Sequence, residues 1–210
     1  MKVLASLALL VAATIGSASA TIITYDTTGS VFTVVGGVNQ PPLTSSFTVS
    51  NGAGSSATIT YLNIVPGSTF NDAAPGTNIQ YGVFQTTFSG PAAPPEIPIT
   101  IPAFTFILHV NETGPIAQSG LITGSSAGGT VTQNSNTVNV SYSPLTVKLG
   151  NTFFNIDPTT RFPAPSTGNG AVAITGTAVG PVPEPGTMLL LGAGLIGFGF
   201  SARKKFLNRS

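Results

Sequence analysis

The chain has 210 residues, of which only 6% are charged, with seven Lys and Arg against six Asp and Glu. The central part of the chain contains no basic patch, so nucleic acid is excluded as an expected partner. Cysteine is absent, which excludes disulfides, thiolate metal sites and cysteine catalysis.

The N-terminal segment has the three parts of a secretory signal peptide. Lys2 supplies a positive start, residues 3–15 are largely apolar, and Ala18 and Ala20 form a small-residue A-x-A pattern. Such a pattern precedes a signal-peptide cleavage site. The sequence therefore predicts a signal peptide over residues 1–20, export by Sec-type machinery and cleavage before Thr21.

The exported part carries very little charge. Residues 21–182 contain five acidic and two basic side chains, for a net charge of −3 (2 − 5). About a quarter of the residues of an average protein are charged, so this surface must consist mainly of Thr, Ser, Asn, Gly and Gln. The length suffices for one domain with a sizeable core, which we expect over residues 21–180. The charged residues are Asp26, Asp72, Glu96, Glu112, Lys148, Asp157 and Arg161.

Segments rich in Thr, Val, Ile and Phe alternate with Gly, Pro, Asn and Ser along this part, as is typical of strands and turns. In one of them Phe104, Phe106, Leu108 and Val110 fall on the same face. We expect an all-β fold, an antiparallel β-sandwich with jelly-roll or Greek-key connections. The predicted strands are residues 21–25, 31–35, 46–50, 57–64, 79–88, 103–110, 116–123, 129–133, 137–142, 145–149, 152–156 and 171–179.

Three segments interrupt the strand pattern. Residues 66–76, 90–102 and 157–170 are rich in Gly and Pro. We predict a surface loop in each, and in the third we expect turns with no buried role.

Groups suited to catalysis are sparse. His109 is the single histidine, and acid/base chemistry with Asp157 or Glu112 is conceivable, although the spacing predicts no pairing. A solvated or hydrogen-bonded histidine on an outer sheet face is the expected role. Glu96 with Glu112 stays open as a glycosidase pair, but nothing beside either residue indicates a tuned carboxylate. We expect neither an enzyme nor a cofactor.

Two pairs of residues are the best candidates for a calcium site, because Ca²⁺ prefers oxygen ligands. They are Asn71 with Asp72 and Asn155 with Asp157. No acidic run of the calcium-loop type is present, and Asx turns explain both pairs more simply. We therefore predict no metal site.

Tyrosines are the candidates for stacking on a sugar ring, because tryptophan is absent. Tyr61 and Tyr142 lie in alternating strands, where partial burial with a hydrated hydroxyl is the more common role. The candidates are Tyr25, Tyr61, Tyr81 and Tyr142.

The C-terminal segment predicts a membrane topology. Residues 181–186 contain three prolines and should be extended, and residues 187–202 are uncharged and mostly apolar. We predict a transmembrane helix there of about 24 Å, short of the ~30 Å hydrocarbon core. Arg203, Lys204 and Lys205 then hold a basic tail, residues 203–210, in the cytoplasm.

Pro183, Glu184 and Pro185, followed by a Gly-rich apolar stretch and a terminal basic cluster, resemble the PEP-CTERM sorting signal of bacterial exosortase substrates. The matching residues are 182–197 and the basic tail, so the resemblance covers about the last 28 residues. It implies an exported protein that is held in the inner membrane and processed by exosortase, a membrane-embedded cysteine enzyme. Glu184 is then the one charged side chain of residues 181–186 with which a recognition site could interact.

The resemblance also implies an association with cell-surface and exopolysaccharide or biofilm material of Gram-negative-type bacteria. We therefore expect a structural or exopolysaccharide-associated component of the cell surface or extracellular matrix. A carbohydrate-binding module on the cell surface is the alternative.

Overall fold

A computed structural model of the protein describes residues 22–34, 44–71, 76–90 and 96–180, together with Gly192 and Gly194. The chain divides into two compact units, one of Thr21–Pro181 and one of Met1–Ala20 with Val182–Ser210. The predicted signal peptide, sorting motif, transmembrane helix and basic tail lie outside the described residues, except for the two glycines, which are helical. Within the described part of the chain, no helix is long and apolar enough to cross a membrane.

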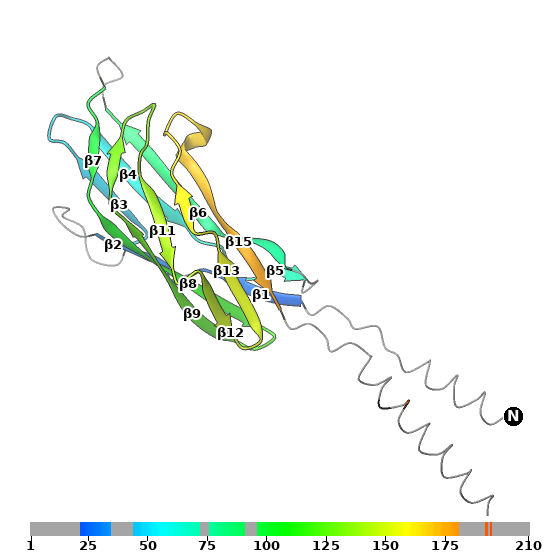
Figure 1. Cartoon of the computed structure of the whole chain (residues 1–210). Coiled ribbons are helices and arrows are strands. Elements are labelled where there is room, and N and C mark those ends of the chain that lie inside the picture. Colours follow the sequence, from blue (N-terminus) through cyan, green and yellow to red (C-terminus); the bar gives the residue numbers. More distant parts are fainter. Residues whose placement is uncertain are drawn as a thin grey trace, which may run out of the picture. The chain divides into compact units, whose positions relative to one another are not determined.

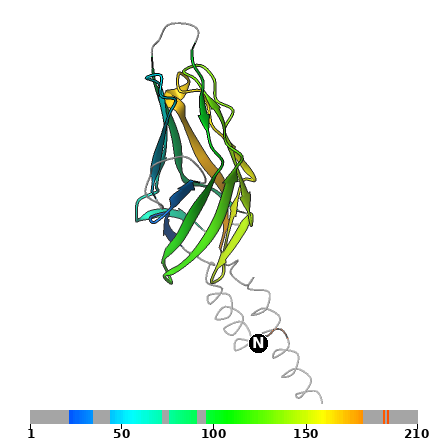
Figure 2. The same ribbon diagram turned by 90° about the vertical axis from the view of Figure 1, so that its left-hand side faces the viewer.

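The unit Thr21–Pro181 is all-β, and its described strands form antiparallel sheets whose long strands run in similar directions (Figures 1 and 2). The first sheet has the order β14 (Thr159–Arg161), β11 (Asn139–Ser143), β9 (Gln118–Ser126), β8 (Phe104–Gly114), β1 (Ile22–Asp26) and β5 (Ser68–Asn71), and β2 (Val31–Val34) also pairs with β8. The second sheet has the order β12 (Thr146–Leu149), β13 (Thr152–Ile156), β15 (Ala171–Val179), β6 (Thr77–Ser89), β4 (Ser56–Leu62) and β3 (Ser46–Ser50). A small third sheet pairs β7 (Ile99–Ile101) with β10 (Gly129–Val131).

Alternation of apolar and polar residues places one face of each long strand in the core. In β8 the side chains of Phe104, Phe106, Leu108 and Val110 are buried, while the residues between them are half-buried. This confirms the face predicted from the sequence. The same period of two continues to Glu112, which is also buried.

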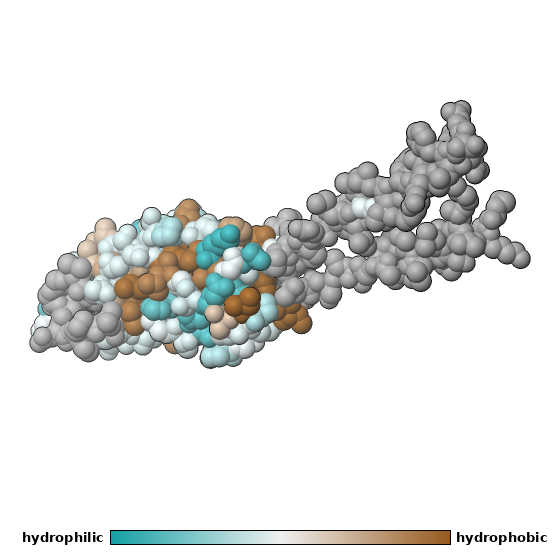
Figure 3. Space-filling model, turned by 90° about the horizontal axis from the view of Figure 1, so that it is seen from below, coloured by the Kyte–Doolittle hydropathy of each residue, from teal (hydrophilic) through white to brown (hydrophobic). Residues whose placement is uncertain are grey.

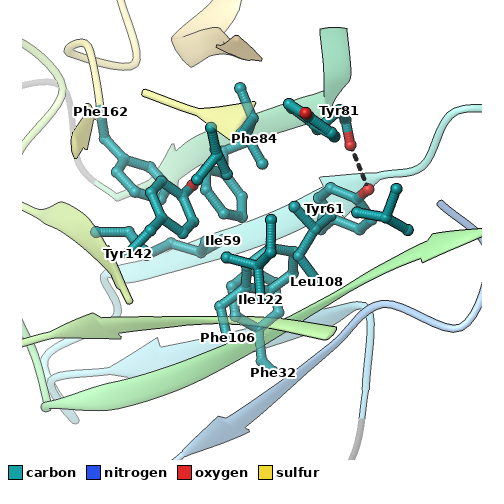
Figure 4. Close-up of a cluster of buried hydrophobic side chains, with 14 of the residues drawn as sticks. Phe32, Ile59, Tyr61, Tyr81, Phe84, Phe106, Leu108, Ile122, Tyr142 and Phe162 are labelled. Carbon is teal, nitrogen blue, oxygen red and sulfur yellow. Dashed lines mark hydrogen bonds between the residues drawn. The ribbon is translucent and has the colours of Figure 1, made fainter. Parts of the chain in front are cut away.

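Aromatic rings from the two sheets meet in the core (Figure 4). The centroid of Phe106 in β8 lies 4.8 Å from that of Tyr61 in β4 and 4.9 Å from that of Phe84 in β6. Phe32 in β2 lies 5.2 Å from Phe47 in β3. The inner faces of the first and second sheets therefore pack against each other.

Each of the three predicted loops contains a short strand, so these predictions were wrong in part. β5 lies within residues 66–76, β7 within residues 90–102, and β14 within residues 157–170. These strands have only three or four residues, too few to show a period against their Gly- and Pro-rich flanks. The third segment also ends in a 3₁₀ turn, Gly168–Gly170.

The third segment has a buried role, contrary to the prediction. Phe162 follows β14, is fully buried, and stacks on Phe84 with 4.8 Å between the ring centroids. Its backbone N–H donates to the carbonyl of Val138 at 3.1 Å. Phe162 therefore closes the core beside β6, although many other residues of the segment are exposed.

β6 contains a β-bulge where it pairs with β15 in the second sheet. Ile174 of β15 pairs with Gly82, whereas Thr175 pairs with Gln80, so Tyr81 is the extra residue. Gly82 has a φ of +126°, which favours glycine. A Cβ at this position would lie 2.6 Å from Cε2 of Tyr61 and 2.7 Å from the carbonyl oxygen of Leu62.

Replacing Gly82 by alanine is therefore expected to destabilise the domain by about 1–3 kcal/mol, as overpacking does elsewhere. The measurement is urea unfolding of residues 21–181. Gly52→Ala is the matched control, because Gly52 also has a positive φ, +73°, but no atom lies within 4 Å of the added Cβ. Equal losses for the two variants would show that backbone conformation alone, and not the close approach of β4, requires glycine in the bulge.

Candidate functional site

The outer face of the second sheet carries a shallow groove of about 440 Å³, which we call the outer groove. It lies over β6 and β15, and the loop after β13 reaches it through Asp157. Its lining consists of Asn78, Ile79, Gln80, Asp157, Thr175, Gly176 and Thr177.

The groove side chains point outward because their neighbours point inward. Ile174 and Ala178 of β15 are buried in the core, so Thr175 and Thr177 face the other side of the sheet. In the ladder with β6, Thr175 pairs with Gln80, and Thr177 pairs with Asn78. Two hydroxyls and two amides therefore stand side by side.

Hydrogen bonds between side chains extend this polar face across neighbouring strands. Thr175 Oγ1 donates to Asp157 Oδ2 at 2.5 Å. Thr146 Oγ1 donates to Asn155 Oδ1 at 2.7 Å, and Asn155 Nδ2 donates to Thr177 Oγ1 at 3.4 Å. The face thus presents a carboxylate, amides and hydroxyls in fixed positions.

One aromatic ring stands on the same face. Phe153 of β13 is 41% exposed, and the Nζ atom of Lys148 lies 5.2 Å from the centre of its ring. Because side chains alternate along β13, Phe153, Asn155 and Asp157 share one side of the sheet. An exposed ring beside amides and a carboxylate is a combination that suits contact with a sugar.

Much of the surface drawn in Figure 3 is pale, since Thr, Ser and Gly lie near the middle of the hydropathy scale. Apolar patches lie between these pale areas. Because only 6% of the residues are charged, this surface exerts little long-range electrostatic attraction on a charged partner.

A second feature is a small cavity of about 80 Å³ at one end of the domain, which we call the Glu112 pocket. The turn after β8 and the turn between β12 and β13 enclose it, and Ile23 of β1 lies beside it. Its lining consists of Ile23, Glu112, Pro115, Ile116, Gln118, Gly150, Asn151 and Thr152.

Glu112 enters this pocket from the inward-facing row of β8. Burial raises the pKa of its carboxyl above the ordinary value, and a hydrogen bond with the Thr152 side chain partly offsets this effect. Its Oε2 atom is buried and has no hydrogen-bond partner among the described residues. Nearby, the backbone N–H of Gly150 donates to Gln118 Oε1 at 2.7 Å and joins the two turns.

Asp26, the other buried carboxyl among the described residues, accepts three hydrogen bonds. It accepts from the backbone N–H of Thr28 at 2.9 Å, from Asn111 Nδ2 at 2.8 Å and from the hydroxyl of Thr28. Burial alone would raise the pKa of Asp26, but these hydrogen bonds outweigh burial and lower it. Asp26 therefore anchors the turn after β1.

The structure places His109 apart from Asp157 and Glu112, the two carboxylates considered for it. His109 is half-buried on β8, its backbone N–H donates to Ser30 Oγ at 2.9 Å, and its ring lies against Gly29. Asp157 lies in the outer groove and Glu112 in the pocket at the domain end. The acid/base pairings considered from the sequence are therefore absent within the part of the chain that the structure describes.

The structure also separates the two candidate glycosidase carboxylates. Glu96 precedes β7 and accepts from Asn134 Nδ2 at 2.6 Å, whereas Glu112 is at the far end of β8. At about 3.3 Å per residue, the eight residues from Phe104 to Glu112 alone extend about 26 Å. Such a separation is too large for a shared glycosidic bond.

All four tyrosines are buried, more completely than the partial burial expected for Tyr61 and Tyr142, so none of these candidates can stack on a sugar. Their hydroxyls bond within the protein. Tyr61 donates to the carbonyl oxygen of Tyr81 at 2.6 Å, as Figure 4 shows. Tyr25 donates to the carbonyl oxygen of Gln80 at 2.8 Å. Burial raises the pKa of Tyr61 to about 12 and raises the pKa values of Tyr25, Tyr81 and Tyr142.

The structure describes only one of the two candidate calcium pairs, Asn155 with Asp157. Asp72 and the Asn71 side chain lie outside the described residues. Asn155 and Asp157 bond to threonines on neighbouring strands, in place of the Asx turns expected from the sequence. Among the described residues, no group of three or more His, Cys, Asp and Glu could hold a metal ion.

The predicted sorting and processing residues cannot be placed in the same way. Pro183, Glu184 and Pro185, the basic residues Arg203, Lys204 and Lys205, and the cleavage residues Ala18 and Ala20 all lie outside the described residues.

Comparison with known proteins identifies only this C-terminal segment. No curated protein and no solved structure matches the chain. Residues 181–205 match the family described as the PEP-CTERM protein-sorting motif. The chain therefore carries a PEP-CTERM protein-sorting motif, which implies export, a membrane-anchored intermediate and exosortase as the processing partner.

Proposed function

We propose that this protein is a non-catalytic component of the cell surface or extracellular matrix, and that its β domain contacts hydrated exopolysaccharide through the outer groove. The observation that carries the proposal is the polar face of β13, β15 and β6, where Asp157, Thr175 and Gln80 stand together. Hydroxyl, amide and carboxylate groups are the hydrogen-bonding partners that sugar hydroxyls require.

The export route belongs to the same proposal. Sec-type machinery exports the chain, the signal peptide is removed before Thr21, and residues 187–202 hold the protein in the inner membrane as a helix. Residues 203–210 remain in the cytoplasm until exosortase acts beside Glu184. The matching sorting motif at residues 181–205 supports this route.

For the fold, we propose a β-sandwich with jelly-roll or Greek-key connections. Support comes from strands that follow each other in the chain but belong to different sheets, such as β4 and β5, β11 and β12, or β13 and β14. Such exchanges between two layers are typical of these sandwiches.

Asp157 is the one charged residue that lines the groove, so we expect each domain to bind polysaccharide weakly. Many copies of the protein on one polysaccharide chain would strengthen the attachment. Binding that is tight at a single site would instead favour the alternative, a dedicated carbohydrate-binding module. The exposed Phe153 beside Asn155 and Asp157 is the observation that favours this second role.

Replacing Gln80 and Asp157 together by alanine should weaken retention of residues 21–181 on the host exopolysaccharide by about tenfold. Each lost hydrogen bond contributes about 0.5–1.5 kcal/mol, and 1.4 kcal/mol is a factor of about ten. Affinity electrophoresis in polysaccharide gels measures the change. The control is Thr123→Ala with Ser125→Ala, two exposed polar residues on β9 of the first sheet. No retention of the unaltered domain, or equal retention of both double variants, would exclude the outer groove as the contact.

A further inference from the structure

Three side chains of complementary chemistry line the Glu112 pocket. Glu112 of β8 and Gln118 of β9 lie directly opposite each other in the ladder between these strands, and both line the pocket. Thr152 of β13 comes from the other sheet, is only 2% exposed, and donates a hydrogen bond from its hydroxyl to the carboxyl of Glu112. A carboxyl, a carboxamide and a hydroxyl therefore share one small cavity between the two sheets.

Glu112 is placed to act as a base toward the hydroxyl of Thr152. Burial of Glu112 raises the pKa of its carboxyl, which makes the carboxylate a stronger acceptor of a proton. Its Oε2 atom is buried and has no hydrogen-bond partner in the described part of the chain. A hydroxyl beside such a base is an activated nucleophile.

The carboxamide of Gln118 is polarised for attack. Its Oε1 atom accepts a hydrogen bond from the backbone N–H of Gly150 at 2.7 Å. A backbone N–H at this position stabilises the negative charge that develops on the oxygen when a nucleophile adds to the carbon. Gly150 precedes Thr152 by two residues, in the turn between β12 and β13. One short turn therefore supplies both the hydrogen-bond donor and the nucleophile.

We propose that Thr152 and Gln118 join in an intramolecular ester bond, which the folded domain forms by itself. Glu112 takes the proton of the Thr152 hydroxyl as Oγ1 attacks Cδ of Gln118, and the N–H of Gly150 holds the oxyanion at Oε1. The C–N bond then breaks, the proton passes from Glu112 to Nε2, and ammonia leaves. One C–O bond replaces one C–N bond, no oxidant or reductant is consumed, and Glu112 returns to its starting state.

The pocket limits the competing reactions with water. Ile23, Pro115 and Ile116 contribute apolar side chains to its lining, and its volume is only about 80 Å³. Since a buried water needs about 10–15 Å³, only a few waters fit. Water would hydrolyse the ester or convert Gln118 to a glutamate, so its exclusion favours the ester and preserves it.

The ester would connect the two sheets covalently, from β9 in the first to β13 in the second. The chain has no cysteine, so a disulfide cannot do this. A bond between residues 118 and 152 restricts the unfolded chain in the way that a disulfide does. The reaction occurs once in each chain, which accords with the non-catalytic role proposed for the protein.

Tryptic digestion of the denatured full-length protein tests the bond directly. Lys148 is the one Lys or Arg between Gln118 and Thr152, and Arg161 is the next along the chain, so trypsin excises residues 149–161. We expect this peptide to stay attached to the fragment that ends at Lys148. The joined mass should be lower than the sum of the two masses by that of one ammonia molecule. Hydroxylamine, which cleaves esters, should then release the peptide.

Variants identify the reacting groups. Thr152→Val keeps the shape of the side chain but lacks the nucleophile, so its peptide should be released without hydroxylamine. Thr152→Ser keeps the hydroxyl and should retain the attachment. Glu112→Gln should reduce the attached fraction by at least about tenfold at equal times, because a general base contributes about 10²–10⁴-fold. Thr160→Val is the control, since Thr160 is also a buried threonine, in β14, and its attachment should be unchanged.

Complete release of residues 149–161 from the unaltered protein would overturn the ester. Attachment that persists in Thr152→Val, or that is lost equally in Thr160→Val, would show that the hydroxyl of Thr152 is not the nucleophile. Equal attachment in Glu112→Gln and in the unaltered protein would contradict the role of Glu112 as the base.

Discussion

Replacing Phe106 by alanine is expected to lower the free energy of unfolding by about 3–5 kcal/mol, the usual cost of removing a buried aromatic side chain. Phe106 is fully buried on β8, and its ring contacts Phe32, Tyr61 and Phe84 at centroid distances of 5.1, 4.8 and 4.9 Å. Tyr61 and Phe84 belong to the second sheet, so the truncation leaves a cavity between the two layers. Urea unfolding of residues 21–181 measures the loss.

Phe153→Ala is the control for this truncation. It removes the same atoms from a ring that is 41% exposed on the outer face, so less apolar area returns to water and no closed cavity forms. We expect a loss below about 1 kcal/mol. Comparable losses for the two variants would contradict a core centred on the contact between the sheets.

Replacing Glu184 by alanine is expected to block sorting, with unprocessed protein accumulating in the inner membrane. Glu184 is the single charge in the proline-rich segment 181–186, which lies within the matched sorting motif. Its side chain is the one group there that can form a charge-assisted hydrogen bond with a processing enzyme. Fractionation of the native host and mass spectrometry of the mature C-terminus measure the outcome.

Glu96→Ala is a suitable control for this variant, since Glu96 lies in the β domain and its described contact is with Asn134. We expect its processing to match that of the unaltered protein. Normal processing of Glu184→Ala would contradict the recognition role of this residue, while leaving the β domain and its groove unaffected.

Local patterns in the sequence were enough to predict the long strands. The alternation of Phe104, Phe106, Leu108 and Val110 correctly indicated the buried face of β8. Extending that alternation by one step would also have indicated that Glu112 points inward. The sequence therefore contained the information that Glu112 points into the core. Because buried carboxyl groups are rare, the sequence alone favours an exposed position for this residue.

Local sequence patterns could not predict which residues contact each other across the two sheets. Thr152 meets Glu112 across the two sheets, and Phe162 meets Phe84 from a segment predicted to be a loop. Both contacts depend on strand pairings between distant parts of the chain, which periodicity does not encode. The outer groove likewise required the register of β15 with β6, including the bulge at Tyr81.

The last strand of the domain, β15, is also one of its most interior. It pairs with β13 along one edge and with β6 along the other, and it ends at Val179, just before the sorting segment. A pull on residue 180 therefore acts along β15, while the hydrogen bonds of both ladders run across it. Pulling β15 out therefore requires the hydrogen bonds of both ladders to break at the same time under shear. A domain tethered through this strand should resist mechanical unfolding much better than one tethered through an edge strand.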